Sequence, residues 1–311
     1  DFDLTYRDGV VTAAETQIVG KGTLTRADLF HIPLQVERAE AFLTYRPNPD
    51  TVTVKGFDAV VAGVHASGEA TAGLDDALAL DTLTAKVLLD AFSSERLTEL
   101  WPKTFSPGGR AWVARNLLKG QVSGADIVAT KAHDGLVETT GAFSAEGVDV
   151  RYWDPMPIAT DVVGTGRFAG DTLELAVTHG VSGGMSTKDV KVEFVHLGAP
   201  TEYIVINGLI SGPAPKLLAI LDREPLRYAQ WLGVAPEATK GDVTGRLKMK
   251  FPLIDAITVD DLEISAEGHV TNAVLPKAVN GWDLAAKSMR IDVNTKRLNV
   301  DGDGELLNEP L

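Results

Sequence analysis

The stretch from Gly164 to Val177 reads GTGRFAGDTLELAV and decides the fold class of the chain. Apolar or small residues alternate with polar ones on both sides of an Ala-Gly-Asp segment at residues 169–171. A period of two places successive side chains on opposite faces of a β-strand, and a short segment with Gly and Asp favours a tight turn. The stretch therefore predicts two antiparallel strands that share one apolar face and one wet face.

The same alternation recurs along the chain, at residues 57–72, 190–195, 203–209, 243–251 and 289–300. Turn signals rich in Pro, Asn and Asp separate these runs by short distances. Short spacings favour antiparallel meanders, because parallel neighbours need long crossover connections. We therefore expect a mainly β fold, built as an elongated and curved antiparallel sheet.

Two segments, residues 88–118 and 213–233, interrupt the alternation and predict short inserted helices. The first has a capping serine, Ser93 or Ser94, and a second helical run that follows a Pro-Gly-Gly sequence. The other segment has prolines near its expected helix starts. We expect the tryptophans of both segments to anchor the helices on the sheet.

An internal repeat organises the chain. The sequence KGQVSG at Lys119–Gly124 returns as KGDVTG at Lys240–Gly245, about 120 residues later. A glycine-led strand, a proline and a second alternating strand follow in the same order. This pattern predicts three β repeats: residues 1–118 and 119–234, each ending in a helical insertion, and a truncated third repeat at 235–311.

The composition excludes several classes of partner and chemistry. Lys and Arg number 29 against 43 Asp and Glu, a net charge of −14, so we expect no nucleic-acid partner, which would require a basic stripe. The chain contains no cysteine, which excludes disulfides and thiolate chemistry. No run approaches the roughly 20 apolar residues of a membrane helix. Because the chain opens within an alternating strand, we expect it to be a piece of a longer protein.

The motifs that resemble reactive sites lack the context that each chemistry needs. The six histidines have no paired metal-ligand spacing. Asn299–Gly304 resembles the start of a calcium loop, but Pro310 stands where the last ligand belongs, so we expect a polar hairpin turn. Gly164-x-Gly166 does not precede a helix, and His179–Gly184 lacks a nucleophile elbow. We therefore expect no catalytic residue, no metal and no cofactor.

Three groups of residues resemble a known family. They are Leu100-Trp101-Pro102 with Pro107-x-x-Arg110-x-Trp112 and Asn116-Leu117-x-x-Gly120; Gly164-x-Gly166-Arg167-Phe168-x-Gly170-Asp171-x-Leu173-x-Leu175; and Gly208-x-Ile210-x-Gly212-Pro213 with Pro225-Leu226-x-Tyr228. Together they resemble the AsmA-like, YhdP-type envelope proteins of bacteria, which are related to TamB, over nearly the whole chain.

The resemblance implies a taco-like repeating β-groove with an apolar lining in the periplasm. It also implies an inner-membrane anchor in a segment outside this chain, transport of phospholipid toward the outer membrane, and contacts with other envelope proteins. It supplies no catalytic residues.

Physical reasoning points to a groove as well, because an apolar sheet face must be covered by helices, by a second sheet or by a ligand. We therefore expect a non-enzymatic protein that binds and transfers phospholipid between the two membranes. The candidate lining residues are Leu24, Phe42, Val52, Val54, Phe143, Phe168, Leu173, Leu175, Val270, Leu298 and Val300. Two alternatives stay open: an envelope scaffold with a packed core, and a polysaccharide-active β-solenoid enzyme, which the long repeat period disfavours.

Overall fold

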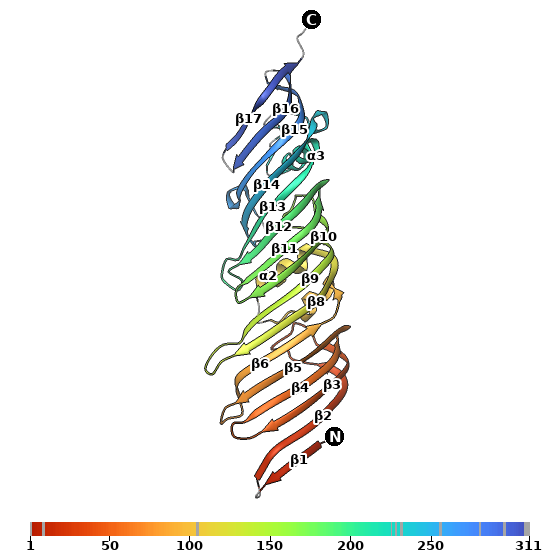
Figure 1. The fold of residues 1–311 in the computed structure, drawn as a ribbon, viewed down its shortest axis with the longest axis vertical. Helices are drawn as coiled ribbons and strands as arrows, with labels where there is room; N and C mark the ends of the chain where they lie inside the picture. Colours follow the sequence, from red (N-terminus) through yellow and green to blue (C-terminus); the bar gives the residue numbers. More distant parts are fainter. Residues whose placement is uncertain are drawn as a thin grey trace. The chain divides into compact units, whose positions relative to one another are not determined.

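Strands dominate the fold, as the alternation predicts. The structure is a computed structural model that describes residues 2–7, 10–103, 106–224, 226–227, 229–230, 233–254, 257–279, 281–294 and 297–307. Strands hold 65% of the chain and helical segments 11%, and the strands form open, curved, antiparallel sheet with three short α-helices among the described residues. The predicted fold class is therefore confirmed (Figure 1).

The chain divides into two compact units. The first unit comprises Asp1–Arg110, Gly120–Ala145 and Thr165–Leu173, and the second comprises Ala111–Lys119, Glu146–Gly164 and Glu174–Leu311. Each unit is described by itself below. The three repeats predicted from the sequence are a different kind of division, and they stay a prediction.

A meander of consecutive strands builds the first unit. Its strands are β1 (Phe2–Arg7), β2 (Val10–Leu24), β3 (Leu34–Arg46), β4 (Thr51–Val61), β5 (Val64–Leu74), β6 (Leu80–Leu89) and β7 (Phe92–Ser93). Each strand from β1 to β6 pairs antiparallel with the next, and both β6 and β7 pair with β8 (Leu117–Lys131). Four strands contain residues of both units: β8, β9 (Glu138–Val150), β10 (Ala159–Ala169) and β11 (Thr172–Ser182).

The second unit continues the same meander pattern. Its strands are β12 (Met185–Val195), β13 (Tyr203–Pro213), β14 (Lys240–Pro252), β15 (Glu263–Val279), β16 (Trp282–Asn294) and β17 (Arg297–Leu307), each paired antiparallel with the next. Residues 299–304 lie within β17, so the polar hairpin turn predicted there is wrong. The alternation of Asn and Asp in this segment satisfies the wet face of a strand equally well.

Helices occupy the predicted insertions. They are η1 (Ser94–Arg96), α1 (Leu97–Leu100), α2 (Pro107–Asn116) and α3 (Ala214–Leu221), with short turns η2 (Pro236–Ala238) and η3 (Val259–Asp261). The hydroxyl of Ser93 accepts a hydrogen bond from the backbone N–H of Glu95 at 3.4 Å, as expected of a capping serine. Positions 225, 228, 231 and 232, where a second helix of the later insertion is expected, lie outside the described residues.

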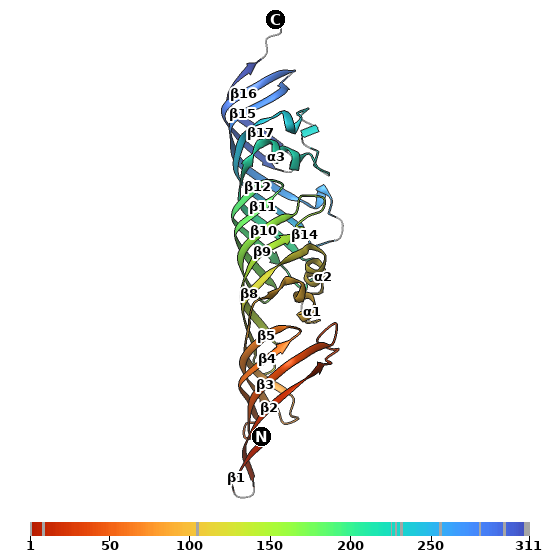
Figure 2. The ribbon, with the colours of Figure 1, turned by 90° about the vertical axis from the view of Figure 1, so that its right-hand side faces the viewer.

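The two long connections of the first unit lie at the same end of its strands. The successive connections of a meander lie alternately at the two ends of its strands. The β2–β3 connection and the insertion after β6 therefore lie at the same end. The two connections meet there: the N–H of Lys103 donates to the carbonyl of Leu29 at 2.7 Å, and its Nζ donates to the carbonyl of Ala27 at 2.8 Å. Figure 2 shows α1 on one face of the first unit's strands, and α3 on one face of the second unit's strands.

Candidate apolar binding face

Two rows of side chains cross one face of the first unit. In cross-strand register, they are Leu43, Val54, Ala70, Ala85 and Ala129, and beside them Tyr45, Val52, Ala72, Leu83 and Lys131. Every one of these side chains is half-buried. The alternation therefore produces a continuous, largely apolar strip over β3, β4, β5, β6 and β8 that the fold covers only in part.

The same face is covered at the strand ends next to the helical insertion. Val64, Phe92 and Val122 are only 2%, 5% and 5% exposed, and Leu97 and Leu100 of α1 pack against them. The helical insertion thus covers this end of the apolar face over β5, β7 and β8. The two rows nearer the opposite end of the strands stay half-open.

Two phenylalanines cover glycines on neighbouring strands of the first unit. A Cβ added to Gly141 would lie 2.5 Å from the ring of Phe168, and a Cβ added to Gly166 would overlap the ring of Phe143. Each ring therefore occupies the space that a side chain on the adjacent strand would fill. Such pairs fix the register of a sheet and level its surface.

The corresponding face of the second unit is packed. Val243, Val270 and Met289 are 5–7% exposed, and they form one buried cluster with Ala214 of α3. Leu217, one turn further along α3, packs against the same cluster. Helix α3 therefore fills the face that the strands leave apolar.

Large side chains fill the opposite end of these strands as well. Ile204, Phe251 and Leu262 are 2%, 1% and 3% exposed. Trp112 of α2 packs edge to face on Phe194, with ring centroids 5.4 Å apart. Trp112 thus fits the predicted anchoring role, and the second unit has an ordinary hydrophobic core.

Five of the predicted lining residues lie in the first unit in partly exposed positions. Val52 and Val54 belong to the two half-buried rows. Phe143 and Phe168 are half-buried in their glycine contacts, and Phe143 also packs against the covered cluster under α1. Leu173 at the start of β11 is half-buried.

Four others occupy different surroundings. Leu24 is 38% exposed at the end of β2, and Val300 is 49% exposed on β17. Leu175 is half-buried, whereas Val270 belongs to the packed cluster beneath α3. The side chain of Leu298 lies outside the described residues.

Phe42 lies on the other face of the sheet. It pairs with Gly56, whereas its neighbour Leu43 pairs with Val54 and therefore carries the apolar row. The ring of Phe42 is 48% exposed.

Because Ala41, Phe42 and Leu43 are all apolar, the alternation alone does not show whether the odd-numbered or the even-numbered residues of β3 face inward. The pairing of β3 with Val54 decides it, and Leu43, Tyr45 and Leu83 are the lining residues that sequence reasoning missed.

An ionic cluster stands at the same end of the first unit's strands as the helical insertion. His65 hydrogen-bonds through Nε2 to Asp58 at 2.7 Å and through Nδ1 to Asp90 at 2.8 Å, and Arg38 pairs with Asp58 at 2.7 Å. The hydrogen bonds to Asp58 and Asp90 raise the pKa of His65, and the hydrogen bond from His65 lowers the pKa of Asp58. Both carboxylates accept from the ring only when it is an imidazolium. The cluster therefore links Asp90, which precedes the helices of the insertion, to β4 and β5.

A metal site and a membrane-spanning helix are both absent from the described parts of the chain. Within those ranges, no group of three or more His, Asp or Glu side chains is arranged to hold a metal ion. The described helices include none that is long and apolar enough to cross a membrane. Comparison of the chain with family models, with curated proteins and with solved structures finds no match. The family resemblance therefore stays an expectation.

Proposed function

We propose that the chain binds phospholipid on the apolar face of its first unit and passes it on without chemical change. The observation that carries this proposal is the pair of half-buried rows centred on Val54 and Leu83. At one end of the strands α1 covers the same face, and towards the other end the rows stay half-open. Each methylene of an acyl chain that enters such a surface gains about 0.8 kcal/mol. A lipid thus needs no specific anchor, and its head group stays in water at the half-open end.

The side chains on this face differ in size from strand to strand. On β5 its side of the strand presents the small side chains of Ala70 and Ala72, between the larger Val52, Val54 and Leu83 of the neighbouring strands. Small residues flanked by branched ones leave room for an unbranched hydrocarbon chain. In the second unit, α3 packs on the apolar face. Among the described residues, no helix packs in the same way on the two rows of the first unit.

In cells, we place this activity in the periplasm, as a step in phospholipid transfer between the inner and outer membranes. The membrane anchor and the envelope partners belong to this proposal and rest on the family resemblance. The net charge of −14 favours zwitterionic over anionic lipid at equal chain length.

A second candidate function is an envelope scaffold with a packed core. The buried clusters of the second unit favour it, because α3 packs on the apolar side chains of its strands. The two functions make different demands on the first unit. Only lipid binding needs its face to stay accessible.

The test is lipid content and uptake by the purified chain. Native mass spectrometry and solvent extraction should find co-purifying phospholipid, and a fluorescent phospholipid should bind saturably. Val54→Asp or Leu83→Asp should abolish uptake, while Thr84→Asp, on the other face beside Leu83, should not. Lipid-free protein that takes up no probe, or equal uptake by all variants, would favour the scaffold.

A further inference from the structure

A row of threonines crosses the wet face of the first unit. Thr44, Thr53, Thr71, Thr84 and Thr130 lie opposite one another in unbroken register on five successive paired strands. Thr71, Thr84 and Thr130 are exposed and Thr53 is half-buried. Thr44 is buried and donates to Glu15 at 3.4 Å, which closes that end of the row. Paired strands lie about 4.8 Å apart, so the row presents hydroxyls at that repeat.

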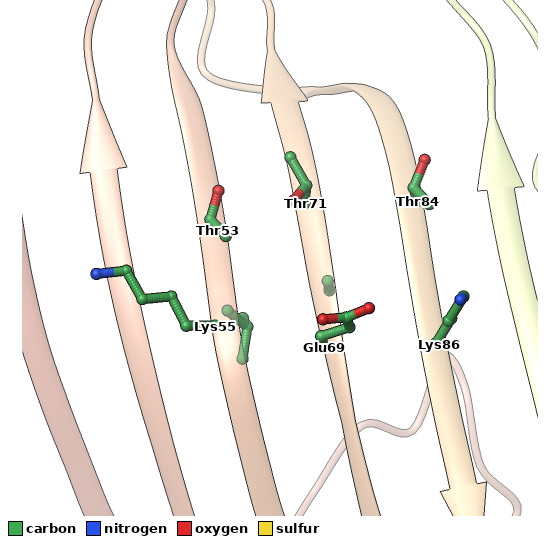
Figure 3. Close-up of a pocket in the computed structure, with 8 residues that line it drawn as sticks. Thr53, Lys55, Glu69, Thr71, Thr84 and Lys86 are labelled. Carbon is green, nitrogen blue, oxygen red and sulfur yellow. The ribbon is translucent and has the colours of Figure 1, made fainter.

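A charged row runs beside the hydroxyls. Lys55, Glu69 and Lys86 lie two positions along β4, β5 and β6 from the threonines (Figure 3). Together with Thr53, Thr71 and Thr84, they line a shallow hollow of about 320 Å³. Lys55 is bonded through Nζ to Glu15 at 2.8 Å. The hollow thus offers the ammonium of Lys86, the carboxylate of Glu69, and hydroxyls that both donate and accept.

An exposed aromatic ring marks one end of this surface. Phe42 precedes Thr44 by two residues on β3, so it shares the wet face, and its ring is 48% exposed. A large apolar ring on a polar face has no part in the core. It provides a flat surface on which another flat, partly apolar group can stack.

We infer that this face binds an extended β-linked glycan, independently of the proposed lipid function. The sugar rings of such a chain repeat at nearly the spacing of β-strands and present hydroxyls along both edges. Those hydroxyls match a row of threonines, and they also satisfy Lys86 and Glu69 together. The C–H face of one sugar stacks on Phe42. Cleavage is not implied, because glycoside hydrolysis uses two carboxyl groups and Glu69 is the single one that lines the hollow.

Isothermal titration of the whole chain with defined oligosaccharides tests this inference. The probes are cellohexaose, chitohexaose and a hyaluronan hexasaccharide, which separate neutral, acetamido and uronate sugars. At least one should bind saturably. The triple variant T53V/T71V/T84V should weaken that binding about tenfold or more, because valine keeps the shape and strand propensity but removes each hydroxyl's hydrogen bonds. Phe42→Ala should weaken it by about threefold to tenfold.

Matched variants separate the site from general surface effects. Thr244→Val removes an outward-facing threonine of β14 in the second unit, and Leu88→Ala removes an exposed apolar side chain of β6 outside the threonine row. Both should leave the affinity within about twofold, and circular dichroism should confirm that every variant is folded. Saturable binding of none of the three probes, or equal affinity of the triple valine variant and the parent, would overturn the inference.

Discussion

The apolar faces of the two units begin from the same alternation and end in different states. Among the described residues, the buried hydrophobic side chains of the first unit are Leu34, Ala59, Val64, Phe92, Val122 and Ala125, and all others belong to the second unit. Conversely, most of the large apolar side chains that are exposed, such as Ile18, Leu78 and Val137, belong to the first unit. The difference lies in what covers the strands.

Residue size explains much of this contrast. The inward positions of β14 carry Val243, Met249 and Phe251, which are all buried, and Val243 belongs to one cluster with Ala214 of α3. On β5, between Val64 and Leu74, the positions of the corresponding face carry only alanine and glycine, which cannot bridge to a covering element. A sheet with one apolar face thus becomes a core where its side chains are large and a helix returns over it, and an accessible surface where they are small.

The largest expected effect is in the packed unit. Phe251→Ala should lower the free energy of unfolding by about 3–5 kcal/mol, because it leaves a cavity at a side chain that is 1% exposed. Urea denaturation followed by circular dichroism measures the change.

A matched pair of valines sharpens the comparison. Val243→Ala, in the packed cluster, should cost about 2 kcal/mol, whereas Val54→Ala, on the half-buried row, should cost about 1 kcal/mol or less. Equal losses in the two variants would mean that the two faces are equally packed and would break the comparison.

A glycine contact in the first unit should give an intermediate effect. In Gly166→Ala the added methyl overlaps the ring of Phe143, and displacing that ring should cost about 1–3 kcal/mol. Gly56→Ala serves as the control, because a Cβ there meets no atom within 4 Å. If both variants unfold at the parent's urea concentration, the aromatic–glycine pairing has no part in stability.

The smallest expected effect is pH-dependent and belongs to the His65 cluster. The pKa of His65 is raised above its usual value of 6.5 by Asp58 and Asp90. Its contribution is therefore fully present below about pH 6.5 and is lost as the pH rises through the folded-state pKa. Asp58 keeps its charge across this range, since its pKa is lowered.

The measurement is the urea midpoint at pH 5.5 and pH 8.5, values that bracket the usual histidine range. The parent should lose more stability between them than His65→Gln, in which the switchable charge is absent. His269→Gln, an exposed histidine of β15, should behave like the parent. An identical pH response in His65→Gln and the parent would contradict the cluster's role.

Much of the fold follows from the sequence, because period-two alternation and insertion signals are local. Ser93 caps the first helical insertion as expected, and the strands fall on the alternating runs. The apolar stretch from Ala59 to Val64 is the instructive exception: it contains the turn between β4 and β5. Ala62 and Gly63 both have positive φ angles, so a tight hairpin turn forms there without a polar signal.

The candidate site follows from the sequence less completely. Val52 and Val54 were predictable, because they alternate with polar residues on both sides. Phe42 and Leu43 were not separable, since only the register with β4 assigns them to faces. Val270 was a sound apolar position, but its burial depends on α3, which comes from a distant part of the chain. Whether an apolar face is covered is a tertiary property, and alternation does not encode it.

The most direct test of the account is to map where an acyl chain sits. The whole chain is incubated with a phospholipid that carries a photoreactive group at the end of one acyl chain, then irradiated, digested and analysed by mass spectrometry. The account predicts adducts on the open rows of the first unit, within β3 to β6 and centred on Leu43, Val54 and Leu83. Adducts confined to the second unit or to the wet face, or no adducts at saturating lipid, would contradict it.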